Sequence, residues 1–168
     1  MPVDFAALPM EKILAMAFKA EREAEAAYKK LQGMVRNFVL KDKLKFLVQE
    51  EKKHQKVLQA LHQKLFAGKD MIHAEKSVVP RLSLALSEDL SVSDLLETAM
   101  DAEKASEEFY DGLAEHAEER GVQELLQYLA SMEHSHYFLL KGEYELASRD
   151  EQYTQREDFQ YDMVHIGP

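Results

Sequence analysis

Apolar residues recur along this chain at alternating steps of three and four over four long stretches. This spacing keeps them on one face of a helix and predicts four amphipathic helices. The stretches cover about residues 8–32, 35–66, 91–119 and 121–148. Pro9 suits a first helical turn, Gly33 suits a helix end, and Ser91 or Ser93 with Asp94 can cap the third helix. The pattern therefore predicts an all-α protein.

The connections between these helices predict how they are arranged. Short links join the first helix to the second and the third to the fourth, which predicts two antiparallel hairpins. Residues 69–90 lose the periodicity and contain Pro80 and several serines. This connection of about 22 residues could reach about 70 Å, and a helix of about 28 residues is about 42 Å long. It is long enough to run the length of the bundle, as the crossover of ferritin-like folds does, or to reach a second subunit.

The inward stripe of the first two helices returns in the last two at an offset of 82 residues. The first hairpin has Leu14, Ala17, Glu21, Ala24, Tyr28, Leu31, then Leu44, Leu47, Glu51, His54, Leu58, Leu61. The second has Leu96, Ala99, Glu103, Ser106, Tyr110, Leu113, then Leu126, Leu129, Glu133, His136, Leu140, Glu143. Ala24/Ser106 and Leu61/Glu143 are the pairs that differ, so the chain reads as one duplicated helical hairpin.

Carboxylates and imidazoles occupy the middle of each stripe: Glu21, Glu51, His54, Glu103, Glu133 and His136. Burying a carboxylate without a partner costs several kcal/mol, so four together need protons, water or cations. Two divalent cations would cancel the four negative charges. In Glu-x-x-His the two side chains lie about 60° apart and about 4.5 Å along the axis, so both can bind one metal. This is the ligand plan of di-iron and di-manganese carboxylate bundles.

Composition narrows the chemistry further. The chain has 168 residues, enough for one domain, with 21 Lys and Arg against 31 Asp and Glu and a net charge of −10. Such acidity argues against nucleic acid and anionic membranes as partners. There is no cysteine, which excludes disulfides, thiol catalysis and thiolate-bound metals. Without a secretory signal or a membrane-length apolar run, we expect a cytoplasmic protein.

With these motifs the chain resembles the rubrerythrin branch of the ferritin-like superfamily over roughly residues 10–147. The resemblance rests on Glu21…Tyr28, Glu50-Glu51-x-x-His54, Glu103…Phe109-Tyr110 and Glu133-x-x-His136. It implies a ferritin-like four-helix bundle made of two hairpins with a long crossover, over residues 1–148, followed by an extension over 149–168. It also implies two iron ions per bundle, and these ligand types leave manganese or mixed occupancy open.

The resemblance further implies a role for each residue. Glu51 and Glu133 would bridge the metals, Glu21 and Glu103 would be terminal carboxylates, and His54 and His136 would each bind one iron. Tyr28 and Tyr110 lie seven residues, about 10.5 Å, beyond the glutamate of their own helix. We therefore expect each tyrosine to hydrogen-bond a ligand from a neighbouring helix.

The implied activity is reduction of hydrogen peroxide or dioxygen by a non-haem di-iron peroxidase, and the alternatives are a ferroxidase or an iron-storage subunit. A metal-free interaction bundle is a third possibility. The chain departs from rubrerythrins proper at Ser106, where they usually carry a further Glu, and it lacks their Cys-rich rubredoxin module. Electrons would therefore come from an external donor protein. A homo-oligomer is expected, with a dimer favoured.

Several other residues are expected to lie outside the site. The remaining histidines should be exposed or hydrogen-bonded within the protein: His62, His73, His116, His134 and His165. Glu25 and Glu107, also 82 residues apart, are expected to be solvated charges at the bundle edge rather than extra ligands. The aromatic residues Tyr153, Phe159 and Tyr161 either cover the bundle or bind another subunit.

Overall fold

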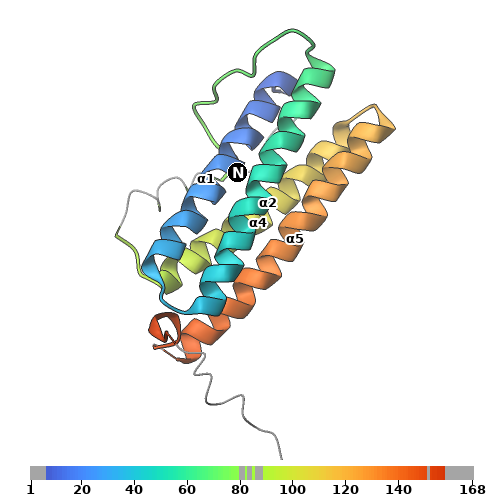
Figure 1. Cartoon of the computed structure of the whole chain (residues 1–168). Helices are drawn as coiled ribbons and strands as arrows, with labels where there is room; N and C mark the ends of the chain where they lie inside the picture. The colour runs from blue at the N-terminus through green and yellow to red at the C-terminus, as the bar shows by residue number, and fades with distance from the viewer. Residues whose placement is uncertain (1–6, 80–81, 83–84, 86–88, 151, 158–168) are drawn as a thin grey trace, which may run out of the picture.

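The computed structural model describes residues 7–79, 82, 85, 89–150 and 152–157. Its elements are helices α1 (Met10–Met34), α2 (Phe38–Leu65), α4 (Val92–His116) and α5 (Arg120–Arg149), and a 3₁₀ turn, η1 (Tyr153–Gln155) (Figure 1). The described residues contain no strand. The predicted all-α, ferritin-like four-helix bundle is therefore confirmed. None of the described helices combines the length and apolarity that a membrane crossing requires.

Local side-chain chemistry sets several helix ends. The side chain of Asn37 accepts a hydrogen bond from the amide of Leu40 and caps α2, and Ser91 caps α4 through the amide of Asp94. Beyond α2, Gly68 has a φ of 80°, a left-handed conformation that glycine adopts without steric cost. Gly33 does not end α1, because the helix continues for one more residue.

The two hairpins pack side by side, and the chain crosses the length of the bundle between them. The end of α2 and the start of α4 lie at opposite ends of the bundle (Figure 1). Val79 and Leu82 of this connection pack against Ala20 of α1 and Ala102 of α4. The long crossover is therefore confirmed, and its described part covers the seam between α1 and α4.

Two apolar clusters fill the bundle, one toward each end. One contains Leu14, Leu58, Leu113 and Leu126. The other contains Leu31, Leu44, Leu96 and Leu140. Burial of these side chains is the main favourable contribution to folding. Between the two clusters the inward positions are occupied by buried glutamates and histidines instead. The bundle interior is therefore apolar, polar and apolar in succession.

The first residues after α5 fold back onto the bundle. The amides of Arg36 and Asn37, in the link between α1 and α2, donate to the carbonyl of Thr154 at 2.8 and 3.1 Å. The Tyr153 hydroxyl donates to Glu143 at 2.6 Å. This part of the extension therefore covers one end of the bundle. For Tyr153 this agrees with the first of the two alternatives given for the aromatic residues of the tail. Phe159 and Tyr161 lie outside the described residues.

Candidate metal centre

All six residues that the stripes placed together meet at one level of the bundle. Each of the four helices contributes: Glu21 from α1, Glu51 and His54 from α2, Glu103 from α4, Glu133 and His136 from α5. None of the six is more than 2% exposed. They converge because steps of three and four keep a position facing inward along the whole helix.

Three carboxylates surround the imidazole of His54. Its Nδ1 atom lies 2.8 Å from Oε1 of Glu133 and 3.3 Å from Oε2 of Glu51. It forms a hydrogen bond of 3.1 Å with Oε2 of Glu21. These carboxylates come from three different helices, so they meet only in the assembled bundle.

His136 has the equivalent surroundings on the other side of the layer. Its Nδ1 atom lies 3.3 Å from Oε1 of Glu51, 3.5 Å from Oε2 of Glu103 and 3.8 Å from Oε2 of Glu133. Glu51 and Glu133 thus each present one oxygen to either imidazole. Glu21 approaches His54, whereas Glu103 approaches His136. The two rings stack with centroids 5.4 Å apart.

This arrangement has the donor set of a two-metal site. Ligand atoms of Glu51, His54, Glu133 and His136 all lie within 4.8 Å of one another. The remaining carboxylates, Glu21 and Glu103, flank this group on opposite sides. Oxygen and imidazole donors without thiolates suit iron, manganese or zinc. The cluster could therefore bind a di-iron centre.

Unsatisfied polar atoms test whether the residues fit such ions. Among the described residues, nine buried side-chain nitrogen and oxygen atoms have no hydrogen-bond partner, and seven of them belong to this cluster. They include both carboxylate oxygens of Glu51 and both ring nitrogens of His136. Buried polar groups are normally satisfied, so a concentration of orphaned atoms indicates an ion or water that completes the site. The residues fit two cations.

Electrostatics divides the carboxylates into two kinds. Burial, with the negative charge of Glu133, raises the pKa of Glu21 and Glu103 well above the usual value. Burial also opposes ionisation of Glu51 and Glu133, but close polar neighbours outweigh it and lower both pKa values. For Glu51 these neighbours are His136 and His54, and for Glu133 they are chiefly Glu103 and His136.

The imidazoles are held in the charged form. Burial lowers the pKa of His136, but the nearby carboxylates of Glu103, Glu133 and Glu51 outweigh burial and raise it to about 12. The pKa of His54 is raised by carboxylates in the same way, against burial. Two imidazolium ions therefore balance two ionised carboxylates when metal is absent. Cations can take the place of the imidazole protons.

A tyrosine from the second hairpin supports a carboxylate of the first. The hydroxyl of Tyr110 donates a hydrogen bond to Oε1 of Glu21. Burial and the nearby charge of Glu21 raise the pKa of Tyr110 well above its usual value, so it remains a donor. The predicted contact between helices is therefore found for Tyr110. Tyr28 is also buried, and its equivalent hydrogen bond stays a prediction.

The other candidate residues lie apart from the cluster. Glu25 accepts hydrogen bonds from Lys29 and Gln55, and Glu107 lies 2.9 Å from Nδ1 of the exposed His134. His116 is exposed and bonds its own helix through the Gly112 carbonyl, and His165 lies outside the described residues.

His62 differs from the expectation. It is buried against the ring of Phe66, and its Nε2 atom has no hydrogen-bond partner, with Glu11 at 3.9 Å. It lies near the end of α2, one residue after Leu61 of the apolar cluster that also contains Leu58.

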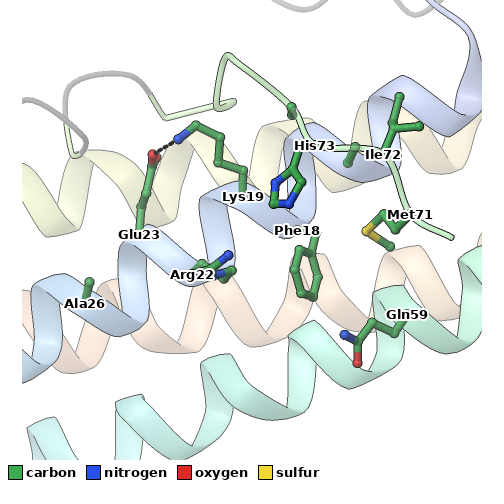
Figure 2. Close-up of a pocket in the computed structure, with 11 residues that line it drawn as sticks. Phe18, Lys19, Arg22, Glu23, Ala26, Gln59, Met71, Ile72 and His73 are labelled. Carbon is green, nitrogen blue, oxygen red and sulfur yellow. Dashed lines mark ion pairs between the residues drawn. The ribbon is translucent and has the colours of Figure 1, made fainter.

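Sequence reasoning did not find a cleft of about 450 Å³ on the side of α1 (Figure 2). Phe18 and Arg22 of α1, Gln59 of α2 and His73 of the connection are among its lining residues. No residue of the metal cluster lines it. The cleft exists because the connection folds back over α1, and no local sequence pattern indicates that contact.

Comparisons with known proteins agree with this geometry. The family model described as Rubrerythrin matches residues 12–144. A solved structure of a hypothetical protein from Pyrococcus furiosus is similar, with a TM-score of 0.80 and 34% identity, covering 89% of this chain and 97% of that chain. No curated protein matches the chain. The family model spans all four helices and every residue of the buried cluster, and the chain therefore belongs to the rubrerythrin family.

Proposed function

We propose that this chain is a di-iron oxidoreductase that reduces hydrogen peroxide or dioxygen. The observation that carries the proposal is the sharing of Glu51 and Glu133 between two imidazoles, His54 and His136. A carboxylate shared in this way suits a bridge between two ions. Glu21 and Glu103, each near one imidazole, suit terminal ligands.

The chain's own residues would bind the ions and control the surroundings. Two ferrous ions would supply the two electrons that, with two protons, convert hydrogen peroxide into two water molecules. The apolar clusters on both sides of the layer exclude bulk water from it. Tyr110 orients Glu21 by its hydrogen bond. Ala17 and Ala99, small buried residues one turn before Glu21 and Glu103, suit a small oxidant better than a bulky organic substrate.

In this proposal the electrons that reduce the oxidised centre come from outside the chain. With no cysteine in the chain, there is no iron–sulfur site of its own to return electrons after each turnover. An external electron-donor protein would do so, in the cytoplasm. We also propose a homo-oligomer, with a dimer favoured.

Anaerobic loading with Fe²⁺ followed by rapid mixing tests the activity. We expect about two irons per chain and faster oxidation by hydrogen peroxide than by dioxygen, followed with the near-ultraviolet absorbance of ferric iron. Oxidation no faster with peroxide, with release of Fe³⁺, would favour the ferroxidase. A chain that binds about two manganese ions and not iron would instead favour catalase-like chemistry, and a chain that binds neither metal would contradict the proposal.

A further inference from the structure

The charge of this acidic protein is unevenly divided between its helices. Helix α2 has seven lysines against three acidic residues, and two of those, Glu50 and Glu51, are buried. Helix α4 has eight acidic residues and one lysine. Helix α2 therefore presents a positively charged surface on a chain whose net charge is −10.

Four of these lysines form one line along the outward side of α2. They are Lys41, Lys45, Lys52 and Lys56. Successive steps of four, seven and four keep them on one helix face, which we call the lysine stripe. Lys52 approaches Glu25 at 3.9 Å, whereas Lys41, Lys45 and Lys56 form no ion pair with a described residue. Most of this positive charge is therefore not neutralised within the described part of the chain.

The duplicated hairpin provides an internal comparison. At the offset of 82 residues, the positions of the lysine stripe correspond to Gln123, Gln127, His134 and Phe138 on α5. The inward stripes are nearly identical, yet none of the four lysines recurs. The corresponding helix α5 therefore forms in the same bundle without these lysines.

An exposed aromatic residue beside the stripe reaches the metal cluster. Phe46 follows Lys45, is 48% exposed, and packs edge-on to His136 with ring centroids 6.5 Å apart. Tyr128 and Leu146 of α5 are also exposed, at 53% and 43%. The described part of the connection packs on the α1–α4 seam. A molecule that touched Phe46 would lie one side chain away from a cluster histidine.

We infer that the lysine stripe and Phe46 form the docking surface of a small acidic electron-donor protein. The inference rests on the proposed redox function. The stripe lies to one side of the exposed aromatic side chain, about 100° round the helix from it. Lysines at the edge and an aromatic residue beside them offer charge attraction and apolar contact, as protein interfaces do. Each encounter would deliver one electron, so two donor molecules would reduce an oxidised two-metal centre once.

The position of Phe46 favours a donor over a second copy of this chain. A second copy could also offer acidic side chains, from α4, but its docking would not require an aromatic contact with His136. Self-association through α2 is nevertheless a distinct outcome of the test.

Binding can be tested on the metal-free chain, independently of activity. The probe is a plant-type [2Fe–2S] ferredoxin, a small acidic carrier, cross-linked by a carbodiimide that joins lysine amines to carboxylates. We expect cross-links at Lys41 and Lys45, and affinity that falls with salt. Lys41→Gln/Lys45→Gln introduces the residues that α5 has at these positions, and should weaken binding about three- to tenfold.

The matched control is Lys12→Gln/Lys104→Gln, which makes the same charge change at exposed positions of α1 and α4. It should bind ferredoxin as the wild type does. Equal loss in both double variants, cross-links spread evenly over all lysines, or cross-links through Lys41 and Lys45 that join two copies of this chain would each overturn the inference.

Reduction kinetics separate this inference from the proposed function. With the iron-loaded, oxidised protein, Lys41→Gln/Lys45→Gln should slow reduction by ferredoxin about three- to tenfold and leave reduction by the methyl viologen radical cation unchanged. If neither reductant delivers electrons to any variant, the proposed function fails, and the binding experiment still decides the docking surface. An unchanged rate with ferredoxin would overturn the inference.

Discussion

Tyr110 of α4 donates a hydrogen bond to Glu21 of α1, so the second hairpin holds a carboxylate of the first. The contact crosses the bundle within the layer where His54 and Glu21 also meet. It links the two halves of a duplicated sequence through a buried polar pair. This pair is one of the places where the two hairpins depend on each other.

Replacing Tyr110 by Phe should therefore destabilise the metal-free protein. The substitution keeps the ring and removes the hydroxyl, which leaves a buried carboxyl oxygen of Glu21 without its donor. We expect a loss of about 1–2 kcal/mol in the free energy of unfolding, measured by urea denaturation. Tyr28→Phe, at the equivalent position, shows whether the symmetric bond to Glu103 exists. Unchanged stability for Tyr110→Phe would contradict the role given to this bond.

The metal content of two variants should distinguish two histidines that lie on the same helix. His136→Ala removes an imidazole that faces three carboxylates, and we expect the metal content to fall from about two ions per chain to one or none. His134→Ala removes an exposed imidazole that pairs with Glu107 and should retain the wild-type content. Metal analysis of both purified variants checks this prediction. Equal metal content in the two would count against the assigned cluster.

Metal binding should release protons. At neutral pH the raised pKa values of His54 and His136 keep a proton on each imidazole when metal is absent, and the pKa values of Glu21 and Glu103 are raised in the same direction. Because cations bind the unprotonated atoms, two ions should displace at least the two imidazole protons. Affinity should therefore fall as the pH falls. Calorimetric titration in two buffers of different ionisation enthalpy counts the released protons, and an enthalpy that is independent of the buffer would contradict the prediction.

The stability of the metal-free protein should fall as the pH rises above neutral. The pKa of His136 rises from 6.5 to about 12 on folding, so its contribution is complete below pH 6.5 and is lost as the pH approaches 12. His54 has the same sign. We expect the urea midpoint to decrease from pH 7 to pH 10 without metal. His136→Ala should have a shallower slope, and the same slope in that variant would show that another group is responsible.

Glu143 should hold the C-terminal extension in place. It is buried where its equivalent is Leu61, and it accepts hydrogen bonds from Lys43 and Tyr153. Glu143→Leu should release the extension, whereas Glu143→Gln retains an acceptor for Tyr153. Amide hydrogen exchange gives the readout, because the amide of Asn37 bonds to Thr154 in the extension. Exchange of this amide should accelerate in Glu143→Leu and stay slow in Glu143→Gln.

Helical periodicity predicted the fold and brought together the six polar residues of the layer. It succeeds for Glu21 or His136 because an inward position on a regular helix stays inward, whatever its neighbours are. Helix boundaries were predicted less accurately. The first helix ends at Met34, two residues beyond the prediction, since Gly33 retains helical geometry within α1. Such ends depend on contacts outside the helix.

Features made by distant segments could not be predicted. The sequence showed that Glu143 breaks the repeat, but its partners Lys43 and Tyr153 lie on α2 and in the extension. The same limit applies to the cleft beside His73, which depends on how the connection folds over α1 (Figure 2). The unequal charge of α2 and α4 was present in the sequence from the start, but the whole-chain value of −10 conceals it.

The equal division of the cluster between the hairpins has a kinetic consequence. Glu21, Glu51 and His54 come from the first hairpin, and the other three residues come from the second. A chain in which only one hairpin has formed therefore lacks half of the ligands. Ions that need both halves stabilise the docked state and not the separated one. Bound ions should therefore slow unfolding of the chain and have little effect on the rate at which each hairpin forms.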